Sequence, residues 1–553
     1  MVDYGVFDIE ASNWINIYAI GYYSNTKFII KKEKLNSNNE YIEFLLNNID
    51  KPIVYAHNGG GYDFLFILDY IKEKKDIKIS KIVVINGKLI SFKLKYKNKS
   101  ITFKDSYAIL PSSLSNLTNS FNVAHKKLRL DYNIGIKDER FNEYFKNDLL
   151  GLYDVLIESN LTEKLTIASN SIHIFKDNFY KYGKFSRNTD KIDNFFRKAY
   201  KGGRVEAIKL YGTSLYYYDI NSLYPYVMLK NEYPLIKQNN YEYTTKYKEG
   251  ITGIYECEVN CEYMHIPLLP YKDSKNKLLF PYGKFKGFYT NREIEKAYNL
   301  GYDIKIISGY VFNECEYIFK EYVEHYYNIK KNSEGSKKEI AKLLLNSLYG
   351  KFGQKRKMLS YSINNNTNVK TDNFMSISAN MNITKSEKYN HYSKYLHSEI
   401  SALITADARL ELYKLIERAG IDNVYYYDTD SIITSYPLNC SAELGQIKKV
   451  AELDEFICIG AKLYAYKTKN DVHITAKGFN VADLKYTDFL SAYKGDISKI
   501  HTNKESVRKF RSSLVSHSNN FANTYNLDRT LRNEYNKRIV LSDNINTKPY
   551  KIG

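Results

Sequence analysis

The apolar and polar positions of residues 424–433 predict a β-hairpin that carries two carboxylates on one side. Aromatic and β-branched residues flank Asp428-Thr429-Asp430, which is typical of two strands joined by a tight turn. Side chains two positions apart in a strand point the same way, so Asp428 and Asp430 lie close together. They repel each other, and a divalent cation such as Mg²⁺ relieves the repulsion. An isolated Asp-x-Asp is more often an ordinary acidic turn, so the interpretation depends on the rest of the chain.

The N-terminal part of the chain also places acids on predicted strands and helices. Two short strands are predicted first, with Asp8 and Glu10 on one face. A later apolar strand enters a glycine-rich bend, and Asp63 opens the helix that follows. Helical apolar spacing surrounds Asp148, and Tyr144 lies four positions earlier on the same face. Four carboxylates on an α/β scaffold are suited to bind two metal ions that hydrolyse a phosphodiester, with Tyr144 orienting the attacking water.

The C-terminal half adds elements that suit a nucleotide. An aromatic strand delivers Asp219, and a turn or helix starts directly after it. Residues 334–350 predict an amphipathic helix with an apolar stripe on one face. Another face offers a cation, an amide and an aromatic ring, namely Lys342, Asn346 and Tyr349. These groups suit a phosphate, a base edge and a sugar or base face. Residues 397–416 predict a further helix that leads to the acidic hairpin.

The composition favours a polyanionic partner. The 553 residues include 81 Lys and Arg against 62 Asp and Glu, a net charge of +19, and nucleic acid is the commonest partner of such a chain. The 55 tyrosines offer faces for stacking on bases. A/T-rich codons would produce the same bias, so composition decides little alone. Neither a membrane span nor a secretory signal is expected, and five scattered cysteines argue against structural disulfides.

Three stretches resemble polymerase motifs of the family B DNA polymerases. They are the D-x-x-S-L-Y-P stretch from Asp219, the K-x-x-x-N-S-x-Y-G stretch from Lys342, and the hairpin around Asp428. The resemblance implies that Asp219 and Asp428 bind metal, that Asp430 supports them, and that Tyr224 excludes a 2′-hydroxyl group. The nucleotide contacts that it implies are Ser222, Leu223, Tyr224, Lys330, Lys342, Asn346 and Tyr349.

The N-terminal acids match, in order and context, the three exonuclease motifs of proofreading polymerases. The resemblance implies a catalytic and metal-binding set of Asp8, Glu10, Asp63 and Asp148, assisted by Tyr144 and Lys127. It includes a Y-x-G-G stretch at 200–203 and a K-x-Y stretch at 462–464. Asp105-Ser106-Tyr107 has Tyr where the family usually has Leu. The implied DNA contacts are Asn58, Ser106, Tyr132, Tyr200, Gly202, Gly203, Thr429, Lys462 and Tyr464.

The resemblance implies a multidomain α/β and α+β fold. An RNase H-like 3′→5′ exonuclease domain at 1–190 is expected to precede a right-hand polymerase, with palm and fingers at 191–460 and a thumb at 461–553. Insertions at about 265–325 and 355–395 are similar in position to those of protein-primed polymerases from linear phages and linear plasmids. One would contact the terminal protein, and the other would close a ring around DNA. The tail from Thr487 is basic and helix-compatible.

The resulting prediction is a DNA-directed DNA polymerase with proofreading exonuclease that starts from a terminal-protein primer. Each active site is expected to use two Mg²⁺ ions, for which Mn²⁺ can substitute. The expected partners are template and primer DNA, dNTPs, the terminal protein and a single-stranded DNA-binding protein, in a bacterial cytoplasm or a mitochondrion. The alternatives are a family B polymerase with ordinary primers, a nuclease with a degenerate polymerase half, and a DNA-binding replication factor without catalysis.

Overall fold

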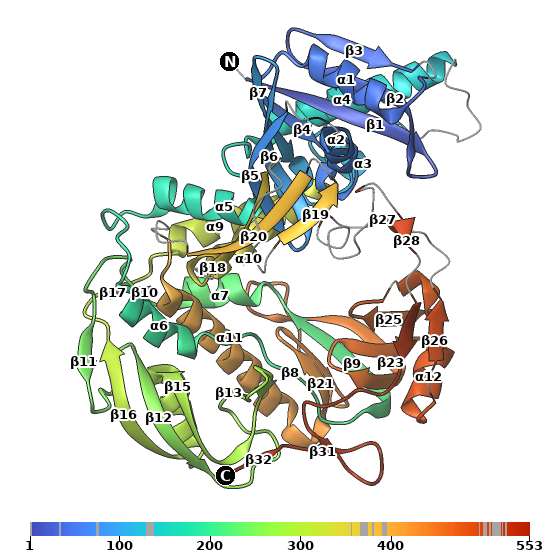
Figure 1. Cartoon of the computed structure of the whole chain (residues 1–553). Helices are drawn as coiled ribbons and strands as arrows, with labels where there is room; N and C mark the ends of the chain where they lie inside the picture. Colours follow the sequence, from blue (N-terminus) through green and yellow to red (C-terminus); the bar gives the residue numbers. More distant parts are fainter. Residues whose placement is uncertain are drawn as a thin grey trace.

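The computed structural model describes most of the chain in full (Figure 1). The described residues are 3–128 without 33–34, 73 and 75–76, then 138–354, 395–496 without 480, and 529–553. Between 357 and 389, and between 498 and 528, short strands are described by their backbone, with Phe510 and Phe521 as the only described side chains. None of the helices in these ranges is long and apolar enough to cross a membrane.

The N-terminal lobe is built on a mixed sheet, blue in Figure 1. Its strands from this lobe are β5 (Lys78–Ile85), β6 (Lys88–Tyr96), β7 (Lys99–Asp105), β4 (Ile53–Ala56), β1 (Tyr4–Ser12), β2 (Asn16–Tyr23) and the edge strand β3 (Phe28–Lys31), in that spatial order. Strand β1 runs antiparallel to β2 and parallel to β4. The helices of this lobe include α1 (Asn38–Asn48), α2 (Asp63–Ile71), α3 (Leu114–Ser120) and α4 (Glu139–Ser159). The two strands expected at the start of the chain are therefore confirmed.

A segment far along the chain extends this sheet. Strands β18 (Lys357–Asn364), β20 (Met381–Tyr389) and β19 (Phe374–Ser378) form an antiparallel set. The set joins the N-terminal sheet where Tyr361 of β18 pairs with Ile82 of β5. Figure 1 shows these gold strands beside the blue lobe. This segment overlaps the predicted second insertion, whose exact limits stay a prediction.

A second sheet carries the acidic hairpin. Its order is β25 (Val472–Ala476), β24 (Leu463–Lys467), β23 (Ile447–Gly460), β9 (Tyr211–Ile220), β22 (Ser431–Thr434), β21 (Val424–Asp428) and β8 (Val205–Ala207). The helices α7 (Leu223–Lys230) and α11 (Ser398–Ala419) share a buried core with β9, β21 and β22. Two further helices, α9 (Lys320–Asn332) and α10 (Gly335–Phe352), pack against each other. The helices predicted at 334–350 and 397–416 are thus confirmed.

A third sheet lies beside α6 (Asp190–Ala199) and α8 (Asn291–Asn299), lower left in Figure 1. Its order is β11 (Glu242–Thr244), β16 (Asp303–Val311), β12 (Gly253–Cys261), β15 (Tyr282–Thr290) and β32 (Lys551–Ile552). The C-terminal strand β32 pairs parallel with β15. The predicted first insertion at about 265–325 covers only part of this sheet, and its limits also remain a prediction.

The expectation of a helical C-terminal tail is wrong for most of the residues described there. After α12 (Tyr486–Tyr493) the described elements are short strands, among them β26 (Ser498–His501), β29 (Asp528–Leu531), β30 (Ile539–Val540) and β31 (Thr547–Lys548). The turn between β30 and β31 shows the reason. Asp543 accepts hydrogen bonds from the backbone N–H groups of Ile545 and Asn546, and such side-chain bonds compete with helix formation.

Residues 538–547, near the end of the chain, pack against the strand next to the acidic hairpin and support it. Arg538 is fully buried and donates to the hydroxyl of Thr547 and to the carbonyl of His265, at 2.8 and 2.6 Å. One of its guanidinium nitrogens lies 3.8 Å from Glu206, in the strand next to the hairpin. A buried charge needs such partners. The C-terminal residues therefore complete the support of the second sheet.

Candidate functional site

The backbone register brings Asp219 and Asp428 together on the second sheet. Ser431 of β22 pairs with Asp219 on one side and with Asp428 on the other. Residues directly opposite each other in a sheet point to the same face. Asp430 lies in the turn, where its carbonyl accepts a hydrogen bond from the N–H of Ile220 at 2.6 Å. Three carboxylates from two distant parts of the sequence therefore meet at the end of the sheet.

Two lysines compensate part of this negative charge. Lys448 Nζ lies 3.1 Å from a carboxylate oxygen of Asp219, and Lys462 Nζ lies 2.8 Å from one of Asp428. Burial and the negative charges of Asp219 and Asp428 raise the pKa of Asp430 to about 6. A clustered set of carboxylate oxygens suits a hard divalent cation. The donor set of this hairpin therefore fits magnesium.

A cavity of about 470 Å³ opens beside these acids. It is lined by Asp219, Ile220, Asn221, Ser222, Leu223, Tyr224, Lys330, Lys338, Glu339, Lys342, Asn346, Tyr349, Asp430 and Lys448. All seven residues predicted to contact the nucleotide are among them. Four lysines in one cavity next to carboxylates suit a polyphosphate bound through metal.

The floor of this cavity is ordered by specific contacts. Lys330 Nζ donates to the hydroxyl of Ser222 at 2.6 Å and to the side-chain carbonyl of Asn221 at 3.2 Å. Burial and the neighbouring lysines lower the pKa of Lys330. The rings of Tyr224 and Tyr349 stack with centroids 4.3 Å apart. This pair links the start of α7 to the face of α10 that carries Lys342.

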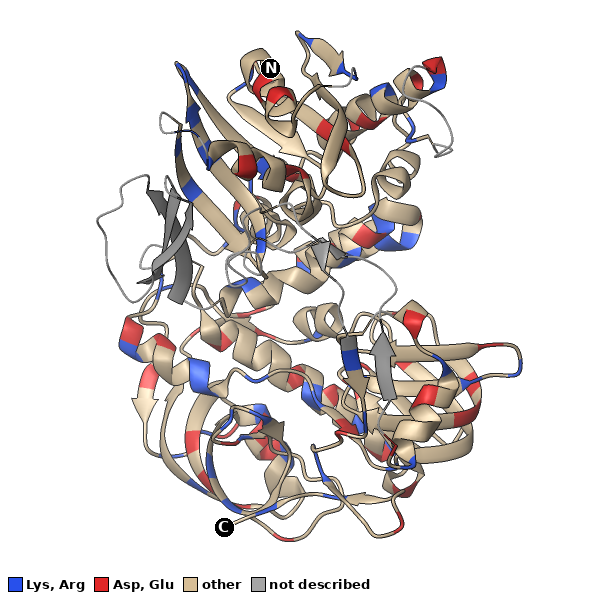
Figure 2. Cartoon of the chain, turned by 45° about the vertical axis from the view of Figure 1, so that its right-hand side comes forward, with Lys and Arg blue, Asp and Glu red and all other residues tan. Residues whose placement is uncertain are grey.

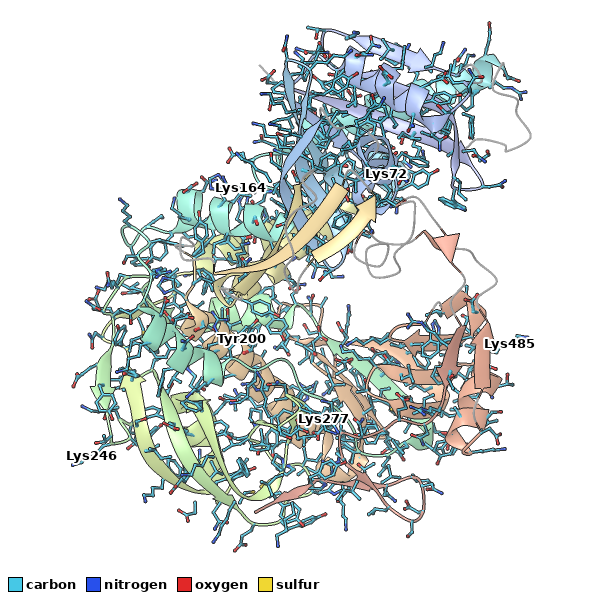
Figure 3. All side chains as sticks on the ribbon, in the orientation of Figure 1. Lys72, Lys164, Tyr200, Lys246, Lys277 and Lys485 are labelled. Carbon is cyan, nitrogen blue, oxygen red and sulfur yellow. The ribbon has the colours of Figure 1, made fainter. Side chains whose placement is uncertain are left out.

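The Y-x-G-G stretch, residues 200–203, packs against the turn of the acidic hairpin. A Cβ atom on Gly203 would lie 2.6 Å from the hydroxyl oxygen of Thr429, so a larger residue does not fit there. Thr429 has a left-handed φ of 60° and donates its N–H to the carbonyl of Arg204 at 2.7 Å. Space around Gly202 is open. Tyr200, labelled in Figure 3, lies near the middle of the molecule.

The N-terminal acids form a second cluster. Oxygen atoms of Asp8, Glu10 and Asp148 lie within 4.8 Å of one another. The Tyr144 hydroxyl donates to Glu10 at 2.9 Å, and Lys127 forms an ion pair with Asp148. These side chains come from β1, from α4 and from the segment before α4. The predicted group of Asp8, Glu10, Asp148, Tyr144 and Lys127 is therefore assembled in space.

The electrostatics of this second cluster also fit a cation. Burial raises the pKa of Asp63 to about 8, and burial followed by the charge of Asp63 raises the pKa of Asp8. One carboxylate oxygen of Asp63 and one of Asp148 are buried without a hydrogen-bond partner. Buried acceptors without partners are rare in proteins. A divalent cation would satisfy them, so the residues present fit a metal site.

The remaining predicted DNA contacts have different placements. Asn58 has a left-handed φ of 61° and accepts a hydrogen bond from Lys88 at 2.8 Å. Ser106 is fully buried, and its hydroxyl lies 2.9 Å from His57 and donates to a backbone carbonyl. Tyr464 is only 6% exposed and packs on Tyr426. Tyr132 lies outside the described residues. The roles of these residues stay predictions.

Several supporting residues could not be seen in the sequence motifs. Lys448 reaches Asp219 because β23 pairs with β9 across more than 200 residues of chain. Glu206 accepts hydrogen bonds from Arg204 at 2.7 and 2.8 Å and from the Tyr427 hydroxyl at 2.5 Å. A charged residue between the apolar residues of the short strand β8 was the available signal. Only the tertiary pairing shows which partner each charge has.

Comparison with known proteins identifies the family. The family model described as "DNA polymerase type B, organellar and viral" matches residues 46–150 and 136–421, which together make up more than half of the chain. The chain belongs to the organellar and viral type B DNA polymerases. A probable DNA polymerase of Podospora anserina is 29% identical over 91% of this chain and 55% of its own length. The DNA-directed DNA polymerase of Enterobacteria phage PRD1 is 26% identical over 79% of this chain and 78% of its own.

The fold of this type B polymerase agrees with a solved structure. Phi29 DNA polymerase, solved with primer-template DNA and incoming nucleotides, superposes with a TM-score of 0.75 at 19% identity, over 96% of this chain and 99% of that one. This confirms the predicted multidomain α/β fold. The first fungal relatives are longer, and the chain spans only 49–58% of their lengths.

Lys201 in the Y-x-G-G stretch should make stability depend on pH. It is buried, and burial lowers its pKa from 10.5 to about 7. Glu293 opposes this lowering, whereas Arg409 and Lys272 add to it. Between pH 7 and 10.5 the unfolded chain then binds more protons than the folded one, so stability rises with pH. The gain is at most about 1.4 kcal/mol per pH unit.

We expect this trend to be lost in Lys201→Met. The free energy of unfolding of the wild type, measured by denaturant titration, should rise relative to the variant between pH 7 and 9. Lys198→Met, at an exposed lysine of the same segment, is the control and should follow the wild type. A constant difference between wild type and Lys201→Met at every pH would contradict the expectation.

Proposed function

We propose that this chain is a DNA-directed DNA polymerase with an attached 3′→5′ exonuclease. The observation that carries the proposal is the pairing of β9, β22 and β21, which brings Asp219 and Asp428 together beside a lysine-lined cavity that Asp219 and Asp430 also line. The second carboxylate cluster in the N-terminal lobe supports the exonuclease. The family of the chain supports both activities.

In synthesis, the residues of the cavity would position the incoming nucleotide. Lys330 and Lys342 would bind the triphosphate, and the stacked pair of Tyr224 and Tyr349 would lie under the sugar and exclude a 2′-hydroxyl group. Two magnesium ions held by Asp219 and Asp428 would lower the pKa of the primer 3′-hydroxyl and stabilise the leaving pyrophosphate. Mn²⁺ has similar ligand preferences and would substitute.

In degradation, the N-terminal cluster would hydrolyse the last phosphodiester of a single strand. Asp8, Glu10, Asp63 and Asp148 would hold the metal ions. Tyr144, whose hydroxyl donates to Glu10, would orient the attacking water. Lys127, paired with Asp148, would neutralise negative charge on the phosphate. The two reactions would take place in separate lobes and compete for the same primer end.

The proposed substrates are template and primer DNA with dNTPs, and the proposed first primer is a hydroxyl group of a terminal protein. Support comes from the phage and fungal relatives and from the two predicted insertions at about 265–325 and 355–395, both of which contain strands. A single-stranded DNA-binding protein is a further proposed partner. The second candidate, within the same family, is a polymerase that uses ordinary primers.

Replacing Asp428 should separate the two activities. We expect Asp428→Asn to lower dNTP incorporation on a primer-template by at least about 10²-fold, because a metal ligand with negative charge is lost. Degradation of single-stranded DNA should stay within about twofold of the wild type, since its carboxylates lie in another lobe. Asp454→Asn, at an exposed position of β23, is the matched control. Equal loss of both activities would contradict two separate sites.

Protein priming has its own test. A labelled dNTP is incubated with the polymerase, magnesium and the candidate terminal protein encoded by the same genetic element, without a nucleic-acid primer. We expect a covalent protein–dNMP adduct that Asp428→Ala does not form. Normal extension of an oligonucleotide without any adduct would favour ordinary priming and contradict the proposal of protein priming by that partner.

A further inference from the structure

An exposed tryptophan lies at the edge of the N-terminal carboxylate site. Trp14 is the only tryptophan in the chain, and it lies in the turn between β1, which carries Asp8 and Glu10, and β2. Trp14 is 47% exposed, which is the largest exposed fraction among the exposed large apolar residues of this lobe. An exposed indole next to a proposed DNA site needs an explanation, since no described core includes it.

The backbone of this turn is unfavourable for tryptophan. Asn13 and Trp14 have φ angles of 51° and 62°, and the N–H of Ile15 donates to the carbonyl of Ser12 at 3.1 Å. Ser12 pairs with Asn16, so the loop has three residues, and its first two have the left-handed φ of a type I′ turn, in which glycine is preferred at the second position. A bulky residue with a left-handed φ is a genuine outlier. Such strain tends to occur where function requires it.

The ring of Trp14 begins a row of aromatic side chains that passes beside the N-terminal carboxylate cluster. Its centroid lies 5.6 Å from that of Tyr62, with the ring planes at 86°. Tyr62 directly precedes Asp63 and makes a similar contact, at 5.2 Å, with Phe66. In a perpendicular pair, one ring presents its edge to the other. At least one broad face of the indole is therefore left uncovered by Tyr62.

We infer that Trp14 is a stacking position for an unpaired base of the strand that enters the exonuclease site, an inference that rests on the proposed exonuclease function. Trp14 is four residues beyond Glu10, and because β1 ends at Ser12 and the chain turns at Asn13, their Cα atoms lie at most about 13 Å apart. A stacked single strand advances about 3.4 Å per nucleotide. We place the stacked base at the third or fourth nucleotide from the 3′ end, which a dinucleotide lacks.

The fluorescence of Trp14 gives a direct test, because no other tryptophan contributes. Oligo(dT) of about ten nucleotides is added to the full-length protein in EDTA, which prevents degradation. We expect the emission of Trp14 to be quenched in a saturable way as a thymine stacks on the indole. Tyr62 and the other tyrosines remain in Trp14→Phe, which serves as the signal control and should show no such change.

Trp14→Gly tests the function of the ring without disturbing the fold, since glycine suits this turn better than tryptophan. We expect binding of the ten-nucleotide strand to weaken about tenfold, the usual effect of removing one stacked base contact. With magnesium, a higher concentration of this substrate should be needed for half-maximal degradation at an unchanged maximal rate. Degradation of a dinucleotide should not change, because it does not reach position 14. Trp14→Phe should retain most of the binding.

Two results would overturn the inference. One is normal degradation by the wild type without quenching and without any weakening in Trp14→Gly. The other is an equal loss of dinucleotide and ten-nucleotide degradation in Trp14→Gly, which would indicate a merely structural role. If the wild type degrades neither substrate, the exonuclease function itself fails, and the inference fails with it.

Discussion

The mutual repulsion of carboxylates is the constraint on which this structure depends. Asp219, Asp428 and Asp430 are held at one sheet end by strand pairing, and Asp8, Glu10 and Asp148 are held within 4.8 Å at another place. Neither cluster would persist without rigid support and nearby positive charge. Lysines supply part of that charge in both lobes, through Lys448 and Lys462 in one and Lys127 in the other. Divalent cations would supply the remaining positive charge. Phosphoryl transfer requires the same positive charge, because negative charge develops on the phosphate oxygens.

The support of the acidic hairpin extends to the end of the chain. Glu206 lies beside the hairpin, accepts hydrogen bonds from Arg204 and Tyr427, and faces the buried Arg538. The C-terminal residues thus pack into the lobe that carries Asp219 and Asp428 rather than forming an independent tail. Figure 2 shows Lys and Arg side by side with Asp and Glu over both lobes. The net charge of +19 suits contact with a phosphate backbone.

The sequence predicted the elements whose signal is local. Strands with alternating acids, the amphipathic helix with Lys342, and the order of the family motifs were all readable, and α10, α11, β1 and β21 are found where they were expected. Contacts that depend on distant pairing were not readable, such as Lys448 with Asp219 and Arg538 with Glu206. The tyrosines show the same limit. They suggested base stacking, but many are among the largest fully buried side chains, for example Tyr22, Tyr218, Tyr255 and Tyr426, where they fill cores.

We propose that this one chain extends a DNA primer at the Asp219 and Asp428 site and shortens it at the carboxylate cluster of the N-terminal lobe. The most direct measurement follows a primer with a labelled 5′ end, annealed to a longer template, with purified protein and magnesium at increasing dNTP concentration. We expect the primer to shorten without dNTP, to be extended above a threshold dNTP concentration, and to stay unchanged in EDTA. A primer that is only shortened at every dNTP concentration, or is never altered, would contradict the presence of both activities.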